Sequence, residues 1–168
     1  GNALTSTKGI GACSSLRTLD VGANQLTSLD DLSTLVALAT LNVSSNQLAS
    51  LAGVESLPSL TTLDAGANQL ADVAAAAALA SVETLRAITI AGGRGDDEGA
   101  PPPNPLCDAD NLKVELLALR PTLVTVDGEA LLNAEKEEAS ALRAERAEQT
   151  ETAHNIHGSG AAHMKPRT

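Results

Sequence analysis

The sequence predicts an α/β fold in which short coils stack into a solenoid. A parallel sheet lines its concave side, and short helical or irregular segments line its convex side. Three observations carry this prediction. Similar segments recur every 22 residues, the apolar residues within each segment alternate as in a short strand, and the 168-residue chain contains no aromatic residue. A core of Leu, Val, Ile and Ala fills thin stacked layers better than one deep interior, where aromatic side chains usually bury much of the area.

The repeats are three tandem copies of the frame L-x-x-L-x-(V/A)-x-x-N-x-L. The copies are "LRTLDVGANQLTSLDDLSTLVA" from Leu16, "LATLNVSSNQLASLAGVESLPS" from Leu38 and "LTTLDAGANQLADVAAAAALAS" from Leu60. Self-similarity at a constant period is typical of repeat architectures, because one unit cannot bury its apolar face without a neighbour.

The frame also predicts which side chains face outward. Leu19 and Val21 are two residues apart, so they share one face of a strand, and stacked copies form a parallel sheet with strands about 4.8 Å apart. The residues between them point to the concave side and form the predicted partner-binding face. That face comprises Thr18, Asp20, Gly22, Thr40, Asn42, Ser44, Thr62, Asp64 and Gly66.

One asparagine closes the strand part of each copy, at Asn24, Asn46 and Asn68. An amide side chain both donates and accepts, so it can satisfy backbone groups of successive coils that would otherwise be buried without partners. We therefore predict a buried, stacked column of asparagines with a structural role.

These repeats resemble leucine-rich repeats. The period is similar to that of the intracellular subfamily that includes a phosphatase-1 regulatory subunit, the U2 A-prime protein and an axonemal dynein light chain. Residues 104–131, "NPLCDADNLKVELLALRPTLVTVDGEAL", resemble the cap that ends many such proteins, although the usual aromatic residue near the cap helix is absent. The resemblance covers residues 2–131 and implies a solenoid with a C-terminal helical cap that binds other proteins.

The domain organisation follows from these segments. We expect a solenoid with its cap over residues 1–131, interrupted by a Gly-, Pro- and acid-rich loop over 91–103, then a helix over 129–150 and an extended tail over 151–168. The helix is interpreted either as a mostly solvated exit from the cap or as a partner-docking helix. The "RGD" within the loop is interpreted as a chance match to an adhesion motif.

The two ends of the array are irregular. The fourth repeat has two possible registers: one puts Ile90 in the asparagine position, and the other makes Leu85, Ile88 and Ile90 the apolar residues of the strand. We prefer the second because it buries both isoleucines. At the other end, Asn2 and Leu4 precede their equivalents by 22 residues, so the chain is expected to begin inside a repeat, with its first apolar layer open.

Few residues of the sequence are suited to catalysis, metal binding or disulfide formation. All histidines (His154, His157 and His163) lie in the predicted tail, so no serine or cysteine of the solenoid has a histidine base, and "HNIH" lacks further metal ligands. Cys13 and Cys107 lie about four coils apart, roughly 20 Å, too far for a disulfide, and are expected to be buried thiols. We therefore predict no enzyme activity, no metal and no cofactor.

The charge of the chain limits the classes of partner that it can bind. The formal net charge of −10 disfavours direct nucleic-acid or membrane binding, and no apolar run is long enough to cross a bilayer. Seven acidic residues and no basic one lie between Arg17 and Arg86, which suits a basic helix or basic surface of a protein partner.

The expected function is thus a non-enzymatic protein–protein interaction scaffold within a large complex. The subfamily resemblance and the Ala-rich composition, which is typical of GC-rich genomes such as those of many green algae, favour a cytoplasmic, cytoskeletal role in a ciliary or flagellar axoneme. A nuclear ribonucleoprotein or phosphatase-targeting adaptor is the alternative.

Overall fold

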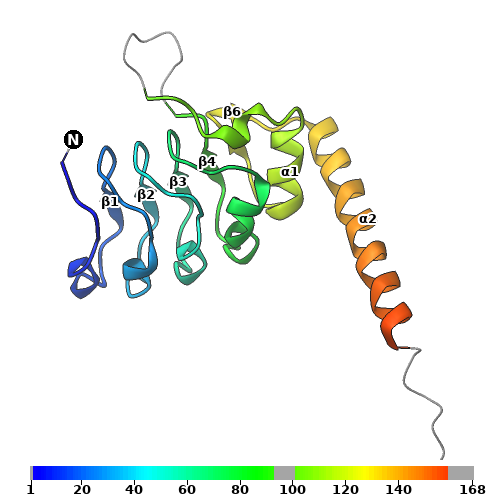
Figure 1. Cartoon of the computed structure of the whole chain (residues 1–168), viewed down its shortest axis with the longest axis horizontal. Helices are drawn as coiled ribbons and strands as arrows, with labels where there is room; N and C mark the ends of the chain where they lie inside the picture. Colours follow the sequence, from blue (N-terminus) through cyan, green and yellow to red (C-terminus); the bar gives the residue numbers. More distant parts are fainter. Residues whose placement is uncertain (1, 93–100, 159–168) are drawn as a thin grey trace, which may run out of the picture.

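The protein is a stack of coils closed at one end by helices (Figure 1), seen in a computed structural model that describes residues 2–92 and 101–158. Six short strands form one sheet in sequence order. They are β1 (Thr18–Asp20), β2 (Thr40–Asn42), β3 (Thr62–Asp64), β4 (Ala87–Thr89), β5 (Thr125–Val126) and β6 (Glu129–Ala130). The first five pair in parallel and β6 pairs antiparallel with β5. The predicted parallel sheet with one strand per repeat is confirmed.

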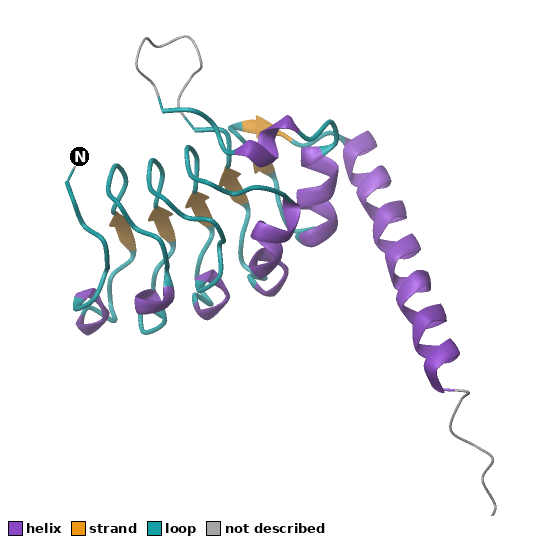
Figure 2. Cartoon of the chain, in the orientation of Figure 1, coloured by secondary structure: helices purple, strands orange, loops and turns teal. Residues whose placement is uncertain are grey.

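Short helical segments form a second row across each coil from the strands (Figure 2). They are the 3₁₀ segments η1 (Ile10–Ala12), η2 (Asp30–Leu32), η3 (Val54–Ser56) and η4 (Val73–Ser81). The space between the two rows is filled by aliphatic side chains, most of them leucine: Leu26, Leu48 and Leu70 are fully buried. The aromatic-free composition therefore suits an interior only one coil thick.

The fourth strand uses the preferred register. Leu63 pairs with Ile88, and Leu85, Ile88 and Ile90 are all buried. The three extra residues of this repeat lie in η4, whose first turn is capped by Asp72 Oδ1 accepting from Ala75 N at 3.1 Å. The longer alanine-rich η4 thus absorbs the insertion without shifting the strand.

The asparagines link neighbouring coils. Asn46 Nδ2 donates to the carbonyls of Val21 and Val43 at 3.0 and 2.9 Å, and its Oδ1 accepts from Leu26 N at 2.9 Å. Asn68 makes the equivalent contacts one coil later, and both side chains are buried. Asn24 is only half-buried, in contrast to the expectation that all three would be buried, because no strand precedes β1 in the described residues to cover it.

A fourth asparagine extends this column. Asn104 is 1% exposed, accepts from Asn68 N and Leu70 N at 3.2 and 3.0 Å, and donates to Ala65 O and Ile90 O at 2.9 and 2.6 Å. It occupies the asparagine position of the fourth coil, although 13 residues separate it from Ile90. The insertion therefore lies between a strand and its own asparagine.

Most of the 91–103 insertion, including its "RGD" motif, falls outside the described residues. Its two ends are fixed. Asp127 Oδ1 accepts from the backbone N–H groups of Ile90 and Ala91 at 2.7 and 2.9 Å, and Asn104 holds the returning chain. The pairing of Asp127 with the insertion base was not predicted from the sequence.

The first residues behave as the end of a coil, as the sequence suggested. Leu4 N donates to Asn24 Oδ1 at 3.1 Å and Leu4 O accepts from Gln25 N at 2.9 Å, the same pair of contacts that Leu26 makes with the next coil. Leu4 is 45% exposed, whereas Leu26 is fully buried. The first apolar layer is therefore partly open, as expected.

The cap closes the other end. It consists of η5 (Pro105–Asp108), α1 (Leu112–Leu119), the β5–β6 hairpin and α2 (Asn133–Gly158). The predicted helix over 129–150 is corrected at both ends. Residues 129–130 form β6 because Asp127 and Gly128, both with positive φ, reverse the chain. Residues 151–158 continue α2 and are not an extended tail, and 159–168 lie outside the described residues.

Only the first half of α2 packs on the cap. Leu131 and Ala139 are buried and Leu142 is half-buried. Arg146 Nη2 contacts both carboxylate oxygens of Glu115 on α1 at 3.0 and 2.8 Å. Beyond Arg146 the helix extends away from the solenoid (Figure 1).

Candidate protein-interaction surface

The concave face consists of the strand residues that flank each buried central residue. The structure leaves these side chains at least partly exposed at every position named from the sequence except Gly66. They are stacked in register: Thr18, Thr40 and Thr62 pair in one column, and Asp20, Asn42 and Asp64 pair in the next. The surface is therefore polar, is formed by small side chains, and repeats regularly from strand to strand.

The second column also shapes the backbone. Asp20 Oδ1 accepts from Gly22 N at 2.9 Å, Asn42 Oδ1 from Ser44 N at 2.9 Å, and Asp64 Oδ1 from Gly66 N at 3.1 Å. Each contact is a turn in which an Asp or Asn side chain binds the backbone two residues on. Sequence reasoning missed this role, although the recurring Asp/Asn-x-Gly/Ser spacing carries the signal.

Gly66 does not belong to the accessible face. A Cβ on Gly66 would lie 2.3 Å from Gly92 Cα, so the base of the insertion packs directly against it. Only a pair of glycines permits this backbone approach, because Gly92 also has a φ of +90°. Gly92 thus covers the third coil at this column.

The electrostatics of the face are simple. Among the described residues, the ion pairs all lie in the cap, so the carboxylates of Asp20 and Asp64 have no cationic partner. Arg86, which borders the strands, donates from Nη1 to the carbonyls of Glu83 and Leu85 at 3.0 Å. Within the described residues, the charged side chains of the concave face are therefore the carboxylates of Asp20 and Asp64, and neither is neutralised by an ion pair.

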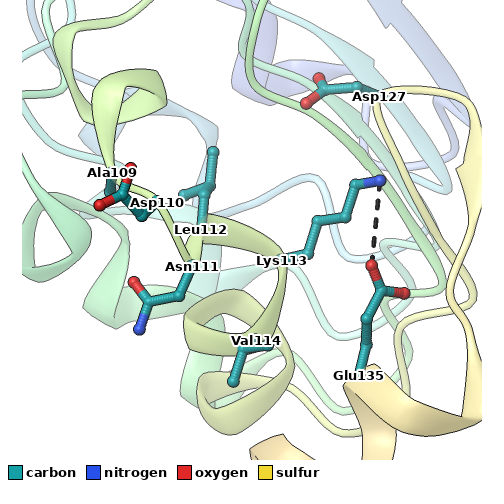
Figure 3. Close-up of a pocket in the computed structure, with 8 residues that line it drawn as sticks. All are labelled: Ala109, Asp110, Asn111, Leu112, Lys113, Val114, Asp127 and Glu135. Atoms are coloured by element: carbon teal, nitrogen blue, oxygen red, sulfur yellow. Dashed lines mark ion pairs between the residues drawn. The ribbon is translucent and has the colours of Figure 1, made fainter.

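A second candidate is a pocket of about 370 Å³ in the cap, lined by Lys113, Asp127, Glu135 and neighbouring residues of α1 (Figure 3). Lys113 pairs with Glu129 and lies 4.0 Å from Glu135. The hydrogen bond between Lys113 and Glu129 raises the pKa of the lysine and lowers that of the carboxylate. Because its charges pair with one another and Asp127 holds the insertion base, this pocket is a structural joint of the cap.

The described residues show no arrangement suited to catalysis. Burial, followed by the negative charges of Asp127 and Asp108, raises the pKa of the Cys107 thiol, which disfavours a reactive thiolate. Cys107 is half-buried and Cys13 is exposed, so the expectation of two buried thiols is wrong for Cys13. Both are free.

The described part of the chain holds no group of three or more potential metal ligands, and none of its helices combines the length and hydrophobicity needed to cross a membrane. His154 and His157 lie on the last turns of α2, and His163 is outside the described residues.

The repeated strands, the asparagine column and the helical cap together define a leucine-rich-repeat solenoid protein. No protein-family model matches the sequence, and no curated protein sequence matches it either. Several solved structures, however, are similar to this chain. The crystal structure of the Drosophila melanogaster SNF/U2A′ complex matches with a TM-score of 0.71 and 20% identity, over 84% of this chain and 76% of that chain.

Two bacterial structures are also similar. Internalins InlF and InlC2 of Listeria monocytogenes match with TM-scores of 0.51 and 0.50 and identities of 21% and 25%. The matches cover 74% and 73% of this chain but only 32% and 46% of those chains. U2A′ and the internalins are leucine-rich-repeat proteins, and at these identities the likeness shows the fold.

Proposed function

We propose that this chain is a non-enzymatic scaffold that binds a protein partner on its concave face. The observation that carries the proposal is the pair of carboxylates, Asp20 and Asp64, held on stacked strands with no ion-pair partner in the part of the chain that the structure describes. Small neighbouring side chains leave room for a partner to approach the sheet. Complementary charge at such a surface steers association and selects the partner.

The proposed partner is a basic helix or basic surface. Asp20 and Asp64 lie two strand spacings apart, about 9.6 Å at the usual 4.8 Å. Basic residues seven positions apart on one face of a helix are separated by about 10.5 Å along its axis, so one helix can reach both carboxylates. The chain offers no aromatic anchor, so large anchoring side chains come from the partner.

For the assembly, we propose a structural or adaptor subunit of a ciliary or flagellar axoneme, cytoplasmic and associated with the cytoskeleton. Its support is the subfamily resemblance and the alanine-rich composition. The second candidate is a subunit of a nuclear ribonucleoprotein or a phosphatase-targeting adaptor. It is favoured because U2A′, whose fold this chain shares over most of its length, was solved as a complex with SNF.

Affinity capture of the tagged full chain from cell extract, read by mass spectrometry, tests both the proposed binding surface and the proposed assembly. Partners that bind the wild type and the Glu137→Lys/Glu138→Lys control, but not the Asp20→Lys/Asp64→Lys variant, support the concave face. Axonemal dynein or tubulin among them supports the first assembly, and spliceosomal or phosphatase subunits support the second. Identical partner sets for all three proteins would contradict the scaffold proposal.

A further inference from the structure

A small pocket lies in the cap, between α2 and the end of α1. It has a volume of about 170 Å³ and is lined by Leu117, Pro121, Lys136, Ala139, Ser140 and Arg143. Leu117 and Ala139 are buried and supply its apolar floor, whereas Lys136, Ser140 and Arg143 are exposed and supply a polar rim. Pockets for drug-sized ligands measure about 300–1,000 Å³, so this one suits a single side chain. We call it the Lys136–Arg143 pocket.

The two cations of this pocket differ from the other cations of the cap. Within the described residues, Lys113 and Arg146 form ion pairs, and Arg120 donates to a backbone carbonyl at 3.0 Å. The side chains of Lys136 and Arg143 form neither an ion pair nor a hydrogen bond with the part of the chain that the structure describes. Their positive charges are therefore available to a ligand.

The polar groups of the rim lie on one side of α2. Ser140 is four residues after Lys136 and three before Arg143, and residues at these spacings are neighbours on a helix surface. The Ser140 hydroxyl has no hydrogen-bond partner among the described residues, whereas Thr150 of the same helix donates to the carbonyl of Arg146 at 2.6 Å. A hydroxyl donor therefore lies between two cationic donors at the same pocket.

The neighbouring glutamates of α2 point in other directions. At 3.6 residues per turn, each residue is rotated by about 100° from the one before it, which places Glu137, Glu138 and Glu145 at least about 100° from both cations of the pocket. Glu135 accepts from a backbone N–H at 2.6 Å, and Glu151 lies about 12 Å beyond the arginine of the pocket along the helix axis. The pocket is therefore locally positive in a chain of net charge −10.

An anionic side chain with an aliphatic stem matches this combination. A carboxylate can accept two parallel bonds from Arg143, and the Lys136 ammonium and the Ser140 hydroxyl can donate to its remaining lone pairs. The two CH₂ groups of a glutamate can cover the apolar floor, and their burial is favourable. Inorganic phosphate has no apolar part to place there, and aspartate has only one CH₂ group.

We propose that the Lys136–Arg143 pocket receives a glutamate side chain from an acidic segment of a protein partner. This site lies on the cap, and its charge is opposite to that of the concave face. The proposal stands on the free cations, the free hydroxyl and the apolar floor of one pocket, and it does not rest on the function proposed for the concave face.

The test is an NMR titration of the isotope-labelled full chain with a short peptide in which Ala and Glu alternate. A matched peptide carries Gln in place of each Glu, and inorganic phosphate is the third probe. Lys136→Gln/Arg143→Gln is the charge variant, and Ser140→Leu fills the pocket without changing the charge. Lys8→Gln/Arg17→Gln is the control, because it removes the same charge from exposed positions of the first coil. Circular dichroism compares the folding of all variants.

The Glu peptide should shift the amide signals of Leu117 and of residues 136–143 in the wild type and in the first-coil control. The Gln peptide should leave these signals unchanged. The dissociation constant of the Glu peptide should be at least about tenfold larger for the charge variant, because charge-assisted hydrogen bonds are lost. It should also rise for Ser140→Leu, because the floor is then covered.

Three results would overturn the glutamate site. They are equal shifts by the two peptides, unchanged affinity of the Glu peptide for the charge variant or for Ser140→Leu, and saturation of the same signals by phosphate at a lower concentration than by the Glu peptide. The concave-face proposal is tested with other residues, so it stands or falls separately.

Discussion

At the scale of single residues, the asparagine column is where one side chain holds two coils together. Asn46 donates to carbonyls on both its own coil and the preceding one, and it accepts from the preceding coil's Leu26 N–H. Asn24 donates only within its own coil and is open to water. The number of coils that one asparagine links therefore depends on whether a strand of the preceding coil lies beside it.

Asn46→Ala should therefore lower the free energy of unfolding by about 1–3 kcal/mol, because it leaves buried backbone groups without partners. Asn24→Ala is the matched control and should cost less, since water can replace its contacts. Urea denaturation of the two variants measures the difference. Equal losses would show that the column does not depend on burial.

The residue before each asparagine has a strained backbone. Ala23, Ser45 and Ala67 have φ values of 52°, 55° and 51°, in the left-handed region that non-glycine residues adopt at a cost. The strain recurs at the same point in the first three coils, before Asn24, Asn46 and Asn68, so it belongs to the way the chain leaves the strand in those coils.

Ala23→Gly should relieve this strain and raise stability by up to about 1 kcal/mol, after the entropic cost of glycine in the unfolded chain is subtracted. Ala52→Gly is the control, because Ala52 is exposed and lacks a positive φ, and it should be destabilising. Thermal denaturation compares them. A destabilised Ala23→Gly would contradict the strain argument.

At the scale of elements, α2 joins the cap through a few contacts at its first half. Ala139 of the helix and Leu131, just before it, are buried, and Arg146 of α2 pairs with Glu115 of α1. Glu115 is mostly buried on its side of the pair, with 15% of its side chain exposed, which makes the contact better protected than a fully exposed ion pair.

Arg146→Ala should increase amide hydrogen exchange in α2 around residues 140–150 while leaving exchange in β1–β4 unchanged. Arg143→Ala removes a neighbouring cation that makes no ion pair with the described residues, so it should change little. Unaltered exchange in Arg146→Ala would show that apolar packing alone holds the helix.

The sequence predicted those elements whose signal repeats and missed those that depend on contacts across long separations. The constant spacing of Leu19, Leu41 and Leu63 defined the strands and their pairing. Asn104 was not assigned to the asparagine column because a 13-residue insertion, residues 91–103, takes it out of the 22-residue period. Likewise, the covering of Gly66 by Gly92 follows from tertiary packing that no local pattern encodes.

At the scale of the whole molecule, residues that are equivalent in successive repeats lie side by side on one surface of the stack. Five parallel strands in register place equivalent side chains in rows, and one of these rows holds the carboxylates of Asp20 and Asp64 on either side of Asn42. The cap closes one end, and Gly92, at the base of the insertion, covers Gly66 in the third coil while Thr62 and Asp64 stay at least partly exposed. The central claim is that this face binds a basic protein partner.

The affinity of the captured partner for charge variants tests that claim most directly. Asp20→Lys/Asp64→Lys reverses two charges on the concave face, and Glu137→Lys/Glu138→Lys makes the same change in net charge on exposed positions of α2. Titration calorimetry should show a dissociation constant at least tenfold larger for the first variant, a loss of about 1.4 kcal/mol in binding free energy. The second variant should show a much smaller change. Equal weakening in both variants, or none in the first, would contradict the assignment of the concave face as the interaction surface.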